Sequence, residues 1–83
     1  MPAWVYVLES LKDGTRYLGS TGVGVSERLA RHNDGDYRFT KGHRPWKMIY
    51  QEEHKTKSDV VKRERFLKSG KGREELKRIL SDL

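Results

Sequence analysis

The sequence predicts a small α+β domain, in which a three-stranded antiparallel sheet is flanked by about three helices. Two short runs rich in β-branched and aromatic residues are joined by an Asp13-Gly14 turn, and a third such run follows. Three other segments carry apolar residues at helical spacing. The chain has 83 residues, enough for one modest core, so we expect one domain over residues 1–83.

The first part of the predicted sheet is a hairpin. Ala3–Glu9 is an apolar run too short for a helix, and we expect a strand that is buried on both faces. Asp13-Gly14 favours a two-residue loop, after which Thr15–Ser20 is predicted to return as the second strand. Such a loop would pair Lys12 with Thr15, Ser10 with Tyr17, and Leu8 with Gly19.

The middle of the chain is predicted to hold a helix, a loop and the third strand. The helix spans Val25 to His32, with Val25 and Leu29 facing inward, and Asn33-Asp34-Gly35 ends it. Residues 35–45 are predicted to form a basic loop with interleaved aromatic side chains, and residues 46–50 to form the strand.

Two helices are predicted in the last third of the chain. The first spans Ser58–Lys68, with Thr56 or Ser58 as its N-cap, and Gly70 with Gly72 ends it. The second covers residues 73–83, where an amphipathic pattern is formed by Leu76, Ile79, Leu80 and Leu83.

Composition narrows the classes of partner. The net charge of +6 suggests a polyanion such as nucleic acid, although a generic solvated surface has the same composition. Disulfides and cysteine-based zinc sites are excluded because the chain has no cysteine. No signal segment or long apolar run is present, so we expect a cytoplasmic protein that does not bind membranes.

Glu64 is the residue that first points to a function. In the predicted helix over Ser58–Lys68, the spacing places it on one face with Val60, Val61 and Leu67. A carboxylate on an inward face is costly to desolvate unless a positive group meets it. Two interpretations follow, a glutamate at the rim paired with a basic neighbour, or a ligand of a metal ion.

Four further polar residues are predicted to lie in pairs. The hairpin pairing projects Tyr6 and Tyr17 from the same face of the sheet, provided that no bulge intervenes. Arg28 and His32 are four residues apart and share a helix face. Taken singly, each tyrosine is explained as a core residue of a strand. Arg28 and His32 are explained as exposed polar residues of an amphipathic helix.

Taken together, these five residues make chemical sense for cutting a phosphodiester. Glu64 could hold one Mg²⁺ or Mn²⁺, a cation that takes few protein carboxylates and keeps several waters. Arg28 could neutralise the scissile phosphate. A tyrosine close to both positive charges could activate water, with His32 assisting.

The same residues lie in motifs that resemble the GIY-YIG nuclease domain. The resemblance covers nearly the whole chain and is closest to the small stand-alone members. It implies that Tyr6 and Tyr17 are the family tyrosines, one of them the general base. It also implies that Arg28 contacts the phosphate, that His32 belongs to the active site, and that Glu64 binds the metal. The motifs are Val5-Tyr6-Val7, Tyr17-Leu18-Gly19, Arg28-Leu-Ala-Arg-His32, Arg63-Glu64, Arg44-Pro-Trp-Lys-Met-Ile-Tyr50 and Lys62-Arg-Glu-Arg-Phe-Leu-Lys68.

The resulting hypothesis is a metal-dependent endonuclease that acts on DNA and selects structure rather than sequence, in repair or recombination. No separate reading module is present, so an unknown protein partner could supply specificity. The alternatives are a non-catalytic nucleic-acid-binding module and a protein-interaction domain. The residues expected to contact nucleic acid are Arg31, Tyr37, Arg38, Phe39, Lys41 and Arg44.

Overall fold

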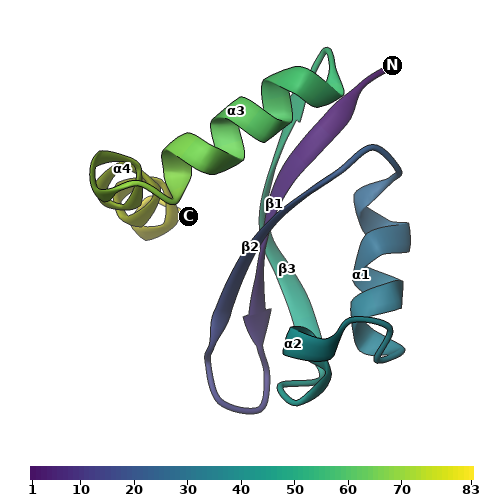
Figure 1. Ribbon diagram of the computed structural model, residues 1–83. Helices are drawn as coiled ribbons and strands as arrows, with labels where there is room; N and C mark the ends of the chain where they lie inside the picture. The colour runs from purple at the N-terminus through teal and green to yellow at the C-terminus, as the bar shows by residue number, and fades with distance from the viewer.

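A computed structural model describes all 83 residues and confirms the predicted fold class. The three strands form one antiparallel sheet in the order β2-β1-β3, accompanied by four helices (Figure 1). None of these helices combines the length and apolar character needed to cross a bilayer. The elements are β1 Ala3–Ser10, β2 Arg16–Thr21, α1 Val25–Asn33, α2 Arg38–Lys41, β3 Trp46–His54, α3 Lys57–Leu67 and α4 Gly70–Ser81.

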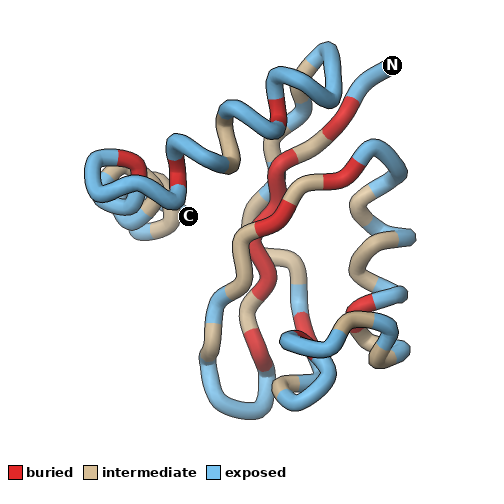
Figure 2. Tube along the Cα trace, viewed as in Figure 1, coloured by how far each residue is buried: buried red, intermediate tan, exposed pale blue.

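The sheet separates two small cores. β1 is the central strand and is buried along most of its length, as its unbroken apolar run predicts (Figure 2). On one face, Ala3 and Val5 pack against Val60 and Leu67 of α3. On the other face, Tyr6, Leu8 and Trp46 pack with half-buried side chains that include two from α1, Val25 and Leu29. The sheet therefore lies between α3 on one side and α1 with α2 on the other, and α4 packs on α3.

The hairpin pairing differs from the predicted one by two residues. Tyr6 pairs with Gly19 and Leu8 with Tyr17, and the loop spans residues 11–14. A wider turn forms because the Ser10 hydroxyl accepts the backbone N–H groups of Lys12 and Asp13, at 3.0 and 3.2 Å. A displacement of two residues keeps each side chain on its face, so Tyr6 and Tyr17 still project from the same side.

Two further predictions are wrong between residues 35 and 54. The predicted loop contains the short helix α2, which buries Thr40. β3 continues to His54 instead of ending near Tyr50, because its pairing with β1 extends to the Ala3–His54 pair. The added residues are polar, as is common in an edge strand. A prediction based on apolar runs therefore does not include them.

The corner between α3 and α4 also differs from the prediction. Gly70 and Gly72 do not end α3 but lie in the first turn of α4, which Ser69 caps by accepting the Gly72 N–H at 3.2 Å. A Cβ on Gly72 would collide with the Phe66 carbonyl oxygen, so this glycine lets the two helices meet closely. Val61 is exposed, because the buried stripe of α3 consists of Val60 and Leu67.

Gly72→Ala is expected to lower the free energy of unfolding by about 1–3 kcal/mol, the usual cost of forcing extra atoms into a packed site. Gly70→Ala is the matched control, since a Cβ there meets nothing within 4 Å. That substitution should be neutral or stabilising, because alanine favours the helix. Urea unfolding of both variants measures the difference, and equal effects would contradict the close approach at Gly72.

Candidate functional site

A buried hydrogen-bonded chain lies at the centre of the α1 face. The Tyr6 hydroxyl and His32 Nε2 are 2.9 Å apart, and both residues are 1% exposed. His32 Nδ1 lies 2.8 Å from the Thr40 hydroxyl, which donates to the Tyr37 carbonyl oxygen at 3.5 Å. The chain therefore joins β1, α1 and α2.

The direction of these hydrogen bonds fixes the tautomer of His32. Thr40 donates to a carbonyl, so it accepts from the Nδ1–H of His32, and Nε2 then accepts from Tyr6. Burial and the Arg28 guanidinium lower the pKa of His32, which keeps the imidazole neutral at pH 7. Burial, reinforced by Tyr17, raises the pKa of Tyr6 well above its ordinary value, so Tyr6 keeps its proton.

Tyr17 is the accessible tyrosine of the pair. Its ring centroid lies 6.3 Å from that of Tyr6 and 5.1 Å from that of His32. The side chain is half-buried, and no protein group forms a hydrogen bond with its hydroxyl. Gly19 makes this packing possible, since a Cβ there would lie 2.7 Å from the Tyr6 oxygen and 2.9 Å from a Tyr17 ring carbon.

Arg28 lies one turn before His32 on α1 and is half-buried. One terminal nitrogen donates to the Tyr37 hydroxyl at 2.8 Å, and the guanidinium carbon lies 5.4 Å from the centroid of that ring. The Nε–H is buried and has no acceptor. No carboxylate forms an ion pair with Arg28. A half-buried cation with an unused donor is suited to an external anion.

No hydrogen bond or ion pair joins Glu64 to these four residues. It lies on α3, beside the edge strand β2 that carries Tyr17, and its carboxylate accepts from Lys68 at 2.7 Å. Burial would raise the pKa of Glu64, but hydrogen bonds from Lys68 and Ser20 outweigh that effect and leave it below its ordinary value. Its negative charge nevertheless contributes to the raised pKa of Tyr6, so the two residues interact electrostatically.

Comparison with known proteins identifies the family. Residues 2–77 match the GIY-YIG catalytic domain. The chain belongs to the GIY-YIG family. A UPF0213 protein of Syntrophus aciditrophicus is 40% identical over 78 residues, covering 92% of this chain and 87% of that protein. A UPF0213 protein of Staphylococcus saprophyticus is 35% identical over 77 residues, covering 92% of each.

A solved structure shares the fold. The solution NMR structure of a UPF0213 protein from Bacillus halodurans aligns with a TM-score of 0.55 and 29% identity, over 95% of this chain and 85% of that chain. These comparisons confirm the resemblance read from the sequence motifs. All five candidate site residues lie within the range that matches the GIY-YIG catalytic domain.

Glu64 is the one carboxylate among the five candidate site residues of this GIY-YIG chain. No three His, Cys, Asp or Glu side chains come together as a set of ligands. The Glu64 side chain is 23% exposed, and its lowered pKa keeps it ionised at neutral pH. A single carboxylate oxygen donor, with waters and substrate phosphates completing the shell, suits Mg²⁺ or Mn²⁺ and not zinc. Either ion would have to displace the Lys68 ammonium.

The residues expected to contact nucleic acid divide into three groups. Arg31 is exposed but paired with Glu27 at 3.4 Å. Tyr37 is part of the buried site, because its hydroxyl accepts from Arg28 and its ring lies 4.6 Å from that of His32. Four residues are exposed and form no ion pair: Arg38, Phe39, Lys41 and Arg44.

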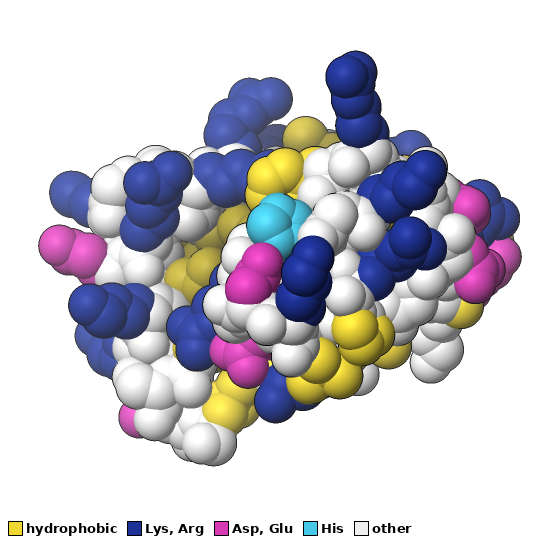
Figure 3. All heavy atoms as spheres, turned by 90° about the horizontal axis from the view of Figure 1, so that it is seen from below, with side chains coloured by type: hydrophobic (Ala, Val, Ile, Leu, Met, Phe, Trp, Pro, Cys, Tyr) yellow, Lys and Arg dark blue, Asp and Glu magenta, His cyan; other side chains and the backbone are white.

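Seen from below, the molecule shows many Lys and Arg side chains spread over its surface, and fewer acids (Figure 3). Phe39 lies among these cations with 59% of its surface exposed. Its ring is 5.9 Å from that of Tyr17, so the exposed aromatic surface continues directly into the site.

The sequence did not reveal two residues that hold the site in place. Thr40 fixes the tautomer of His32, and its carbonyl also accepts from the Trp46 indole at 2.8 Å. The Asn33 amide forms two bonds with the Trp46 backbone, at 2.7 and 3.1 Å, which tie α1 to β3. The sequence predicted Asn33 only as part of the segment that ends the helix, and no signal in the sequence identified Thr40.

Proposed function

We propose that this GIY-YIG protein is a divalent-metal-dependent endonuclease that hydrolyses phosphodiester bonds in DNA. The observation that carries the proposal is Arg28, a half-buried guanidinium with no carboxylate partner and a buried Nε–H with no acceptor. A phosphate oxygen would supply the missing acceptor. The free Tyr17 hydroxyl lies on the same face, beside His32.

The site residues would divide the reaction among them. Arg28 would stabilise negative charge on the phosphate in the transition state. Tyr17 would act as the general base that takes the proton of the attacking water, as the water oxygen bonds to phosphorus and the P–O bond to the leaving oxygen breaks. Tyr6 and neutral His32 would position Tyr17 without touching the substrate. Glu64 would hold the divalent metal ion, which when bound would supply Lewis-acid stabilisation of the developing negative charge.

The exposed surface around α2 supports selection of DNA structure. The backbone can be neutralised by Arg38, Lys41 and Arg44 without reading bases. Phe39 offers an exposed ring on which an unpaired base can stack. Such a surface favours branched or single-stranded segments over plain duplex, which suits a role in repair or recombination.

A second candidate is a non-catalytic nucleic-acid-binding module on the same fold. The observation that favours it is the Lys68–Glu64 ion pair, which is the rim interpretation of Glu64 suggested by the sequence. A panel of forked, nicked, duplex and single-stranded DNA, each with Mg²⁺, Mn²⁺ or chelator, separates the two candidates. Metal-dependent cleavage supports the enzyme, and tight binding without cleavage of any substrate supports the binder.

Tyr17→Phe is expected to lower the single-turnover cleavage rate by about 10²–10⁴-fold, the usual contribution of a general base. Tyr6→Phe should cost less in rate and more in stability, because it removes a buried partner of His32. Rates at saturating protein and urea unfolding of both variants test this division. A larger rate loss in Tyr6→Phe would reverse the assignment of the base.

Binding to duplex DNA is expected to weaken steeply as the salt concentration rises. Each phosphate neutralised should contribute about −0.9 to the slope of log affinity against log salt concentration. Lys41→Ala should flatten that slope by about one contact. Lys77→Ala is the matched control, an exposed lysine of α4 on the other side of the sheet. Equilibrium binding at several salt concentrations measures both, and a flat response of the unaltered protein would exclude nucleic acid as the partner.

A further inference from the structure

A groove opens between α4 and the sheet, on the face opposite the candidate active site. α4 packs chiefly on α3 and stands beside the sheet instead of covering it (Figure 1). In the space-filling view, hydrophobic side chains show at the bottom of a hollow surrounded by Lys and Arg (Figure 3). The groove has a volume of about 250 Å³, and its apolar lining consists of Val7, Leu18, Leu67, Leu76 and Leu80.

The rim of this groove is entirely cationic. Arg16, Lys68 and Arg73 complete its lining, and no acidic side chain contributes. Arg73 forms no ion pair. Arg16 pairs with Glu9 at 3.2 Å and Lys68 with Glu64 at 2.7 Å, but both cationic side chains are more than half exposed. Exposed pairs of this kind are weak and exchange readily with an incoming carboxylate.

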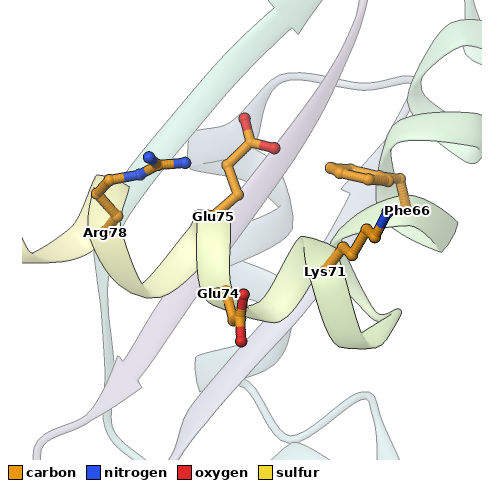
Figure 4. A pocket seen from close by; sticks show the side chains of 5 residues that line it. All are labelled: Phe66, Lys71, Glu74, Glu75 and Arg78. Atoms are coloured by element: carbon orange, nitrogen blue, oxygen red, sulfur yellow. The ribbon is translucent and has the colours of Figure 1, made fainter.

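A second hollow, on the far side of the α3–α4 corner, lacks this selectivity (Figure 4). It has one apolar side chain, that of Phe66, and two cations that face two acids. Glu75 there is already paired with Arg63 at 3.4 Å. Because its charges compensate one another, this hollow favours no class of ligand.

We propose that the groove between α4 and the sheet binds an acidic peptide segment of a partner protein. The segment would insert a leucine, isoleucine or valine side chain between Leu18, Leu76 and Leu80 and place its carboxylates on the cationic rim. Leucine and isoleucine suit the purely aliphatic lining, whereas a nucleobase needs aromatic faces on which to stack. The volume is below the roughly 300 Å³ at which small-molecule sites begin, so one or two side chains fit better than a cofactor.

This proposal does not depend on the nuclease activity. If the proposed function also holds, such a partner would bring the domain to its substrate. Arg28 and His32 lie on the other side of the sheet from the groove, so nucleic acid at that face and a partner in the groove could bind together. The two sites meet only at Lys68, which pairs with Glu64 at 2.7 Å.

The test is an NMR titration of the full chain with a short acetylated and amidated peptide in which leucines alternate with glutamates. We expect saturable shifts of the Leu18, Leu76 and Leu80 methyl groups and none at Leu8 or Leu29, which lie on the other face. A peptide with serine in place of leucine should bind at least about tenfold more weakly, because it lacks the buried side chain. A peptide with lysine in place of glutamate should not bind.

Arg73→Glu should weaken binding of the glutamate peptide by at least about tenfold and create binding of the lysine peptide. Arg78→Glu is the matched control, since Arg78 is an exposed cation of the same helix that does not line the groove. It should leave both affinities unchanged. Thermal unfolding of the two variants verifies that each is folded.

Several outcomes would overturn the proposal. One is the absence of saturable shifts at the groove methyl groups, and another is equal binding of the serine peptide, which would leave only charge attraction. Equal losses in Arg73→Glu and Arg78→Glu would remove the groove as the binding place. Shifts of the same methyl groups by single-stranded DNA, but not by the peptide, would assign the groove to nucleic acid.

Discussion

Glu64→Gln is expected to abolish metal-dependent cleavage, with a loss of at least about 10²–10³-fold in single-turnover rate. The substitution keeps the volume of the side chain and removes the only carboxylate among the five candidate site residues. A metal ion supplies several kcal/mol of charge stabilisation in phosphoryl chemistry, which corresponds to this loss in rate. Affinity for DNA should stay within a few-fold, because Arg38, Lys41 and Arg44 are untouched.

Binding of Mn²⁺ measured without DNA gives a second readout, and it should fall with the same substitution. Glu27→Gln is the matched control, because Glu27 also pairs with a cation four residues later on a helix, Arg31 at 3.4 Å. Both substitutions should cost about 0.5 kcal/mol or less in stability. Unchanged cleavage in Glu64→Gln would mean that Glu64 only forms an ion pair with Lys68 and does not bind the metal.

The fold was predictable because its signals are local and repeated. β1 reads as a strand buried on both faces, α4 has a regular apolar stripe, and both features are present. The hairpin pairing was wrong by two residues, yet Tyr6 and Tyr17 remained on one face because side chains alternate with period two. An error of one residue would have separated them.

The parts that could not be predicted depend on contacts between distant segments. Thr40 holds His32 only because α2 forms and turns its hydroxyl toward α1. A glycine after a predicted helix indicates the end of that helix. Gly72 instead leaves room for the Phe66 carbonyl oxygen of the preceding helix, where a Cβ would collide. The shared face of Arg28 and His32 followed from helical spacing, whereas the unpaired Nε of Arg28 required the packed structure.

Arg28→Ala is expected to lower the cleavage rate by about 10²–10³-fold at saturating protein, the usual cost of removing one preorganised charge stabiliser. Its effect on affinity should be smaller, since the guanidinium is assigned to the reacting phosphate and most of the affinity to cations around α2. Stability should change little, because the lost hydrogen bond to Tyr37 is offset by removal of a buried donor that has no acceptor. A destabilised fold with normal cleavage would make Arg28 a structural residue that supports Tyr37.

Two further variants of α1 separate charge from geometry. Arg31→Ala removes an exposed arginine of the same helix, paired only with Glu27, and should leave the rate unchanged. Arg28→Lys keeps the positive charge but loses the planar set of donors, so it should recover only part of the rate. Full activity in Arg28→Lys would mean that the site needs a positive charge and not a bidentate contact. A loss confined to affinity in Arg28→Ala would reassign Arg28 to ordinary backbone binding, and the proposed chemistry would then lack its stabiliser of the phosphate.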